Sequence, residues 1–197
     1  MTPLAVIRHG ATAWNDAGRM QGRQDITLTD AARAFFAARA APPELDGFAW
    51  TASPLARAHE TARLLAPGAP LGLEPALIEM GWGDWEGATL DELRARLGDG
   101  FGDIEDRGLD FLPPGGESPR MVQARLQPWL ARLGAAARPT VAVTHKGVIR
   151  ALLGLATGWD FLGKPPARLD WTAAHLFAVD PAGRPHLERA NLPLARR

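Results

Sequence analysis

The 197-residue chain alternates short apolar, β-rich runs with helix-forming segments, and this alternation limits the folds it can adopt. The clearest strand is predicted at Thr140 to Thr144, and further apolar runs cover residues 3–7 and 48–52. Strands that alternate with helices favour a largely parallel sheet with helices on both faces. We therefore expect an α/β fold, built as a three-layer α/β/α arrangement around a mostly parallel central sheet.

Capping residues indicate where two helices begin. Thr29 or Asp30 is the predicted N-cap of an Ala-rich helix that runs to about residue 39. Ser53 takes the cap and Pro54 the first position of a predicted helix to about residue 65. Further helices are predicted over residues 118–133 and 147–157, and late strands or a terminal hairpin at residues 175–179 and 185–189.

Residues 81–116 differ from the rest of the chain because they are Gly-rich, acidic and interrupted. One short helix is predicted there, from Thr89 to Leu97, since Thr89 and Glu92 have capping-box spacing. We interpret this stretch as an insertion or lid between core elements. No repeat or linker divides the sequence, so residues 1–197 are expected to form a single domain.

Charge and composition exclude several classes of function. The 22 basic residues balance 22 acidic ones, which gives no reason to expect nucleic acid or an anionic membrane as a partner. The absence of cysteine excludes disulfides, thiolate catalysis and thiolate metal sites. No secretory signal is visible, and the apolar runs fall short of the roughly 18 residues that span a bilayer. A cytoplasmic protein is expected.

Two histidines, His9 and His145, each directly follow a predicted strand. Ligands bind at the carboxyl ends of strands in an open parallel sheet, where these two positions can converge. Arg8 adjoins the first histidine, and Arg57 lies in the helix after Ser53. Guanidinium groups match the oxygens of a phosphate, although either histidine alone would as readily be structural.

Six blocks in this order resemble the histidine phosphatase superfamily, the phosphoglycerate-mutase-like clan, and most closely its small broad-specificity and α-ribazole-type phosphatases. They are Arg8-His9-Gly10-Ala11-Thr12 with Trp14-Asn15, Gly18 to Gly22 through Leu28-Thr29, Ser53 to Ala58 with Thr61, Glu79 with Gly83 to Gly87, Pro113 to Ser118, and Thr144-His145 with Gly147 to Arg150.

The resemblance implies a role for each matching residue. His9 would be the nucleophile, attacking phosphorus to form a phosphohistidine, which requires a neutral imidazole. Arg8, Arg57 and His145 would surround the phosphoryl oxygens. The side chain of Asn15 would add a donor, and the loop with Gln21 and Gly22 would lie beside the pocket.

Glu79 would be the general acid that protonates the leaving alkoxide and later activates water. Such proton transfer contributes about 10²–10⁴-fold, and it calls for a carboxyl whose pKa is raised. Asp84 and Glu86 are competing candidates by composition alone, but Glu86 is interpreted as the brace of a turn. The resemblance therefore favours Glu79.

The chain is expected to act without metal or cofactor. No His-x-x-x-His pair, paired-aspartate loop or cysteine cluster is present, and the acidic cluster at Asp103, Glu105 and Asp106 is explained by a solvated surface. The predicted reaction is the hydrolysis of a small phosphate monoester. Two alternatives stay open: a phosphoglycerate mutase, and a catalytically silent module that binds a phosphorylated ligand.

Two features leave the substrate undefined. Lys146 follows the second histidine, where the family often has a small residue, and it either adds positive charge at the pocket or faces solvent. Aromatic residues of the 81–116 stretch either line the pocket or form that stretch's own core; they are Trp82, Trp85, Phe101 and Phe111. The sequence names neither the phosphate ester nor the oligomeric state.

Overall fold

A six-stranded sheet forms the centre of the computed structural model, which describes residues 1–197 except for the side chains of Asp99, Asp103 and Glu105. The strand order is β4-β3-β5-β1-β6-β7. The strands are β1 (Thr2–Arg8), β3 (Ala49–Ala52), β4 (Leu71–Leu73), β5 (Thr140–Thr144), β6 (Ala174–Val179) and β7 (Pro185–Leu192).

The sheet is mostly parallel. Strands β4, β3, β5 and β1 run in one direction, whereas β6 is antiparallel to β1 and β7 is antiparallel to β6. In the central pair, Leu4 lies opposite Thr140 and Arg8 lies opposite Thr144. Because these strands end in register, the residues that follow them emerge together at one edge of the sheet.

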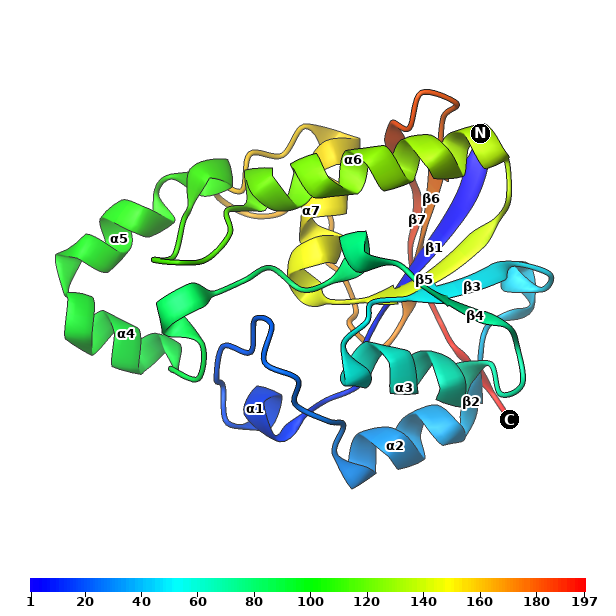
Figure 1. The fold of residues 1–197 in the computed structure, drawn as a ribbon, viewed down its shortest axis with the longest axis horizontal. Coiled ribbons are helices and arrows are strands. Elements are labelled where there is room, and N and C mark those ends of the chain that lie inside the picture. Colours follow the sequence, from blue (N-terminus) through cyan, green and yellow to red (C-terminus); the bar gives the residue numbers. More distant parts are fainter.

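Helices cover both faces of the sheet, with α6 and α7 on one side and α2 and α3 on the other (Figure 1). Side chains alternate between faces along a strand, so Leu4 and Val6 pack toward α6 and α7 while Ala5 and Ile7 pack toward α2 and α3. The helix bounds are α2 Asp30–Ala37, α3 Ala56–Leu65, α6 Pro119–Ala136 and α7 Lys146–Thr157. The predicted α/β/α layers are confirmed.

Smaller elements complete the chain. Helix α1 (Ala13–Asp16) interrupts the first long loop, and strands β2 (Arg39–Ala40) and β8 (Ala195–Arg196) form a separate antiparallel pair. Short 3-10 helices lie at Pro43–Leu45, Pro75–Leu77, Gly83–Trp85 and Gly108–Asp110.

Residues 81–116, called the insert below, carry α4 (Leu90–Leu97) and α5 (Asp99–Glu105) and extend to one side of the sheet (Figure 1). Trp85, Leu93 and Phe101 form a separate hydrophobic cluster within it. The capping box predicted at Thr89 is present, with Glu92 bonded back to the cap. Sequence reasoning missed α5, whose glycines weaken the helical pattern. The side chains of Asp103 and Glu105, from the predicted acidic cluster, lie outside the described residues.

One predicted helix start is wrong. Helix α3 begins at Ala56, its N-cap is Leu55, and no side chain caps it. Ser53 and Pro54 therefore lie before the helix and outside its first turn. The serine hydroxyl is 2.7 Å from the His145 ring, so it is engaged in a tertiary contact that local sequence does not reveal.

No helix among the described residues is both long enough and apolar enough to cross a membrane.

Candidate active site

His9 and His145 meet at the carboxyl edge of the sheet. The backbone N–H of His9 donates to Thr144 at 2.9 Å, which extends the pairing of β1 and β5 by one residue. The two imidazole rings lie 5.0 Å apart between centroids, tilted by 57°. Both side chains are buried. The convergence predicted from strand ends is therefore present.

The tautomer of His9 follows from one hydrogen bond. Its Nδ1 lies 2.6 Å from the carbonyl oxygen of Gly10, which only accepts, so Nδ1 carries the proton and Nε2 keeps its lone pair. Burial holds the pKa of His9 well below its usual value, and the charges of Arg57 and Arg8 lower it further. The ring is thus neutral with a free nucleophilic nitrogen.

His145 is oriented by Ser53. The His145 Nε2 lies 2.7 Å from the serine hydroxyl, and the backbone N–H of Leu55 donates to that hydroxyl at 3.3 Å. The hydroxyl can donate its own proton to Nε2, and we assign the tautomer on that basis, with the His145 Nδ1 as the N–H donor. Burial keeps the pKa of His145 well below its usual value, with His9 and Arg57 adding to the shift.

Arg57 is fully buried on α3 and fastens the loop that precedes it in sequence. Its two terminal nitrogens donate to the carbonyls of Gln24 at 2.7 Å and Gly22 at 2.8 Å. The backbone of Gly10 in turn donates to Thr61 of the same helix at 3.0 Å. These bonds hold the β1–α1 connection and the 22–24 loop against α3.

Four buried side-chain nitrogens lack a hydrogen-bond partner among the described residues, and three of them belong to this cluster: Nε of Arg8, Nε of Arg57 and Nδ1 of His145; the fourth is Nε2 of His175 on β6. An unpaired buried donor is destabilising by about 1–3 kcal/mol, so several of them in one place indicate a site where a bound group supplies the missing acceptors. Two of them belong to guanidinium groups. A tetrahedral oxyanion has the charge and the acceptor oxygens to satisfy all three donors.

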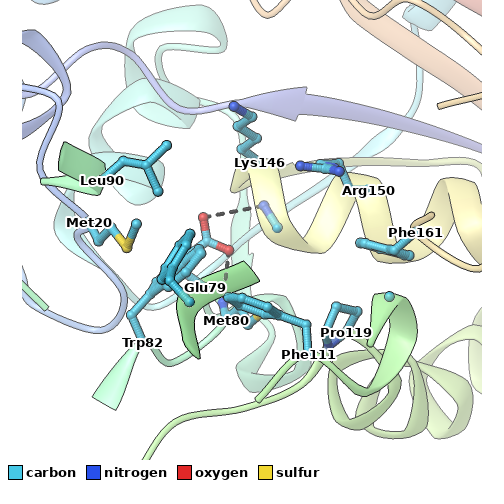
Figure 2. Close-up of a pocket in the computed structure, with 13 residues that line it drawn as sticks. Met20, Glu79, Met80, Trp82, Leu90, Phe111, Pro119, Lys146, Arg150 and Phe161 are labelled. Atoms are coloured by element: carbon cyan, nitrogen blue, oxygen red, sulfur yellow. Dashed lines mark hydrogen bonds between the residues drawn. The ribbon is translucent and has the colours of Figure 1, made fainter. Parts of the chain in front are cut away.

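Glu79 lies beside this cluster and is buried. Its carboxylate accepts from the backbone N–H of Met80 at 2.8 Å and of Gly147 at 3.4 Å (Figure 2). Burial raises the pKa of Glu79, and these hydrogen bonds together with Arg57 and Arg8 oppose the rise. A carboxyl with a raised pKa is suited to donate a proton.

The backbone at Glu79 is held in place by a set of contacts that the sequence did not predict. Arg125 of α6 donates to the carbonyl of Ile78 at 2.6 Å and to Glu117 at 3.1 Å. The hydroxyl of Thr144 donates to Leu77 at 2.7 Å. The only sequence signal was a basic residue within the apolar side of a predicted helix.

Asn15 and Gln21 are tied together through Thr12. The Thr12 hydroxyl lies 3.2 Å from the Oδ1 of Asn15 and 2.9 Å from the Oε1 of Gln21. The backbone N–H of Thr12 also donates to the Asn15 oxygen at 3.1 Å, so the Asn15 side-chain NH₂ stays free to donate elsewhere. Gly22 contributes its carbonyl to Arg57 rather than a contact of its own.

The competing carboxylates are placed differently. Glu86 accepts from the backbone of Arg23 at 2.9 Å, from the side chain of Gln24 at 3.0 Å and from the backbone of Trp82 at 3.2 Å. These contacts join the 22–24 loop to the insert, which agrees with the predicted bracing role. Asp84 is exposed. Glu79 is the buried carboxylate of the three.

Two cavities adjoin the cluster. The larger, about 500 Å³, contains Glu79 and Gly147 together with Lys146, Arg150 and aromatic residues of the insert (Figure 2). The smaller, about 280 Å³, contains Arg8, His9, Asn15 and Trp171. The predicted nucleophile and the predicted proton donor thus open onto different cavities.

Among the residues whose side chains are described, no group of three or more His, Asp or Glu residues is arranged to hold a metal ion.

The comparison with known proteins agrees with this geometry. The family model described as the histidine phosphatase superfamily (branch 1) matches residues 4–192. A 2,3-bisphosphoglycerate-dependent phosphoglycerate mutase of Methylobacterium radiotolerans is 36% identical over 170 residues, covering 79% of each chain. A glucosyl-3-phosphoglycerate phosphatase of Mycolicibacterium vanbaalenii is 34% identical over 177 residues, covering 81% of this chain and 78% of its own.

Solved structures give the same result. A mycobacterial glucosyl-3-phosphoglycerate phosphatase in complex with VO3 matches with a TM-score of 0.77 at 28% identity, over 98% of this chain and 100% of its own. A phosphoserine phosphatase of Entamoeba histolytica in complex with 3-phosphoglyceric acid matches with a TM-score of 0.79 at 26% identity, over 97% of both chains. The paired histidines, the family match and these relatives agree: the chain belongs to branch 1 of the histidine phosphatase superfamily.

Proposed function

We propose that the protein is a metal-independent phosphomonoesterase that acts through a phosphohistidine at His9. The observation that carries the proposal is the neutral His9 ring, with Nδ1 held by the Gly10 carbonyl and Nε2 free, next to the unpaired donors of Arg8, Arg57 and His145. These groups supply a nucleophile and a site for a phosphoryl anion in one place.

In the first step, His9 Nε2 attacks phosphorus and the bond from phosphorus to the ester oxygen breaks. The protonated Glu79 gives its proton to the departing oxygen, so the product leaves as an alcohol. Arg8, Arg57 and the His145 Nδ1–H donate to the phosphoryl oxygens and stabilise the charge that shifts onto them.

In the second step, the Glu79 carboxylate takes a proton from water while the water oxygen attacks phosphorus. The bond from phosphorus to Nε2 breaks and inorganic phosphate leaves, which returns both His9 and Glu79 to their starting protonation. Because the same carboxyl serves both steps, the leaving alcohol and the attacking water occupy the Glu79 side of the site, the 500 Å³ cavity.

The second candidate is a phosphoglycerate mutase, favoured by the relatives of that name. In that reaction the phosphoryl group on His9 passes to a hydroxyl of a bound phosphoglycerate instead of to water. The insert favours hydrolysis modestly, because it carries only Arg94, Arg96 and Arg107 as basic residues among many acidic ones.

The test is the turnover of p-nitrophenyl phosphate with excess EDTA, followed by phosphate release from a panel of natural esters. We expect phosphate release that EDTA does not affect, an acid-labile ³²P label on the protein, and loss of both in His9→Asn. Conversion of 3-phosphoglycerate to its 2-isomer without net phosphate would instead establish the mutase. Binding of phosphate esters with no turnover of any would establish the silent binding module, and abolition of activity by EDTA would disprove metal independence.

A further inference from the structure

Two cations, Lys146 and Arg150, line the 500 Å³ cavity beside Glu79 and have no part in the steps above. They are four residues apart on α7, so their side chains lie on the same face of that helix (Figure 2). Lys146 is exposed and Arg150 is half-buried. Trp82 and Phe111 of the insert line the same cavity.

Both cations are held by aromatic rings rather than by carboxylates. The Lys146 ammonium lies 5.6 Å from the centroid of Trp171. The Arg150 guanidinium lies 5.0 Å and 5.3 Å from the rings of Trp159 and Phe161, which stack on each other at 4.3 Å. Among the side chains that the structure describes, neither cation forms an ion pair. The rings therefore fix the positions of the two charges without neutralising them.

This arrangement is unfavourable for the protein alone. Like charges four residues apart destabilise a helix by about 0.2–0.5 kcal/mol. Partial loss of solvation lowers the pKa of Arg150 and of Lys146, and the charges of Arg150 and Arg8 lower the pKa of Lys146 further. The carboxylate of Glu79 acts in the opposite direction on the pKa of Lys146, but in the proposed mechanism Glu79 is protonated before the first step. A bound anion would compensate both charges.

The position of the pair decides which part of a substrate it meets. The phosphoryl group belongs beside His9, Arg8 and Arg57, and the alcohol leaves on the side of Glu79. Lys146 and Arg150 line the cavity on that side, so an anion held there belongs to the alcohol rather than to the reacting phosphate.

We propose that Lys146 and Arg150 form a subsite for a second anionic group, a carboxylate or a second phosphate, on the alcohol of the ester. The proposal rests on the phosphatase function above and defines its substrate class: phosphate monoesters whose alcohol carries a further negative charge. The aromatic side chains of Trp82 and Phe111 then pack against the carbon skeleton between the two anions.

The test compares kcat/KM within two matched pairs of esters. Glycerol 3-phosphate and 3-phosphoglycerate differ by a carboxylate; fructose 6-phosphate and fructose 1,6-bisphosphate differ by a phosphate. The wild type is expected to prefer the doubly anionic member of at least one pair by about tenfold or more in kcat/KM. The pair that shows this preference identifies the second anion as a carboxylate or a phosphate. Lys146→Gln and Arg150→Gln are each expected to lower that preference about tenfold.

Lys164→Gln is the matched control, since Lys164 is the other lysine of the chain, is exposed and does not line the cavity. It is expected to keep the preference, as is Arg150→Lys, which retains the charge. Thermal melting shows whether the Arg150 variants are folded. No preference in either pair, or an unchanged preference in both glutamine variants, would overturn the proposal.

The outcome for the proposed function is read separately from p-nitrophenyl phosphate, which has no second anion. If the wild type releases phosphate neither from p-nitrophenyl phosphate nor from any of the four esters, the phosphatase proposal fails, and tryptophan fluorescence titration with the same four esters takes the place of kinetics. Tighter binding of the doubly anionic member that Lys146→Gln and Arg150→Gln abolish would still support the subsite, and equal binding would refute it.

Discussion

At the scale of single residues, the site depends on protons that are placed before any ligand arrives. The Gly10 carbonyl fixes the proton of His9 on Nδ1, and with the Ser53 hydroxyl donating to Nε2 we assign the proton of His145 to the corresponding nitrogen. Burial keeps both rings neutral by lowering their pKa and keeps Glu79 protonated over a wider range by raising its pKa. One low-dielectric environment thus favours the protonation states that the proposed nucleophile, oxyanion donor and acid require.

The acid role of Glu79 predicts a dependence on the leaving group. Glu79→Gln should lower kcat for an alkyl phosphate by about 10²–10⁴-fold and for p-nitrophenyl phosphate much less, because nitrophenolate leaves without a proton. Since the acid form is required, the wild-type rate on alkyl esters should fall as pH rises through the raised pKa of Glu79. Steady-state kinetics on both ester types checks this prediction. An equal loss of kcat for the two esters would disprove the acid role.

Ser53 is proposed to position His145, although the sequence predicted it as a helix N-cap. Ser53→Ala should lower kcat by about tenfold or more with a smaller change in KM, since the Nδ1–H of His145 is no longer enforced. Thr51→Ala, which removes a hydroxyl from the same strand region without a contact to the site, is the control. Because no side chain caps α3, circular dichroism melting should change little; a large loss of stability with normal activity would show a purely structural serine.

At the scale of elements, the ends of β1 and β5 supply the histidines, and the first turn of α7 receives Glu79. The backbone N–H of Gly147 donates to the carboxylate, and the approach is so close that a side chain at this position would push the Glu79 carboxylate away. A Cβ on Gly147 would lie 2.5 Å from the Glu79 Oε1. The close approach of Glu79, which lies 68 residues earlier in the chain, therefore explains why a glycine follows His145-Lys146.

Gly147→Ala should consequently displace Glu79 even though alanine is the better helix former by about 0.5–1 kcal/mol. We expect activity on alkyl esters to fall at least tenfold while stability is unchanged or slightly raised. Gly100→Ala in α5 is the matched control, because nothing lies within 4 Å of its added Cβ. Urea unfolding and kcat for both variants measure this; full activity in Gly147→Ala would show that the acid does not need its observed position.

At the scale of the whole molecule, three buried histidines make the stability of the fold depend on pH. His9, His145 and His175 are all buried and all have a lowered pKa, that of His175 being about 4. His175 accepts from the backbone of Asn191 at 3.2 Å, which ties β6 to the C-terminal end of β7. These rings stay neutral in the folded protein at pH values where the unfolded chain already binds protons.

Acidification below the ordinary histidine pKa should destabilise the folded protein through these rings. Above the unfolded pKa of about 6.5 both states are neutral and pH has no effect through these groups. As pH falls from there toward 4, the unfolded chain takes up protons that folded His175 does not, so the free energy of unfolding decreases. Urea unfolding at pH 7 and pH 5 should show this decrease, and His175→Gln should reduce it. An equal decrease in the variant would assign the effect to other groups.

The sequence alone determined the layers and most of the site. Strands β1 and β5 contain short apolar, β-rich runs of the kind found in buried strands, and a histidine follows each strand. The blocks at Arg8, Arg57 and Glu79 indicated the family before any distance was known. Strand patterns, caps and motifs each depend on neighbouring residues. They can therefore be identified from the sequence one segment at a time.

The tertiary structure decided what depends on residues far apart in the chain. Ser53 turns to His145 instead of capping α3, and Arg125 holds the backbone that carries Glu79. Lys146, ambiguous in the sequence, lines the cavity with Arg150 and is held by Trp171. Burial and geometry in the folded state decide whether a side chain pairs with a local or a distant partner. Both are defined only once the layers have packed.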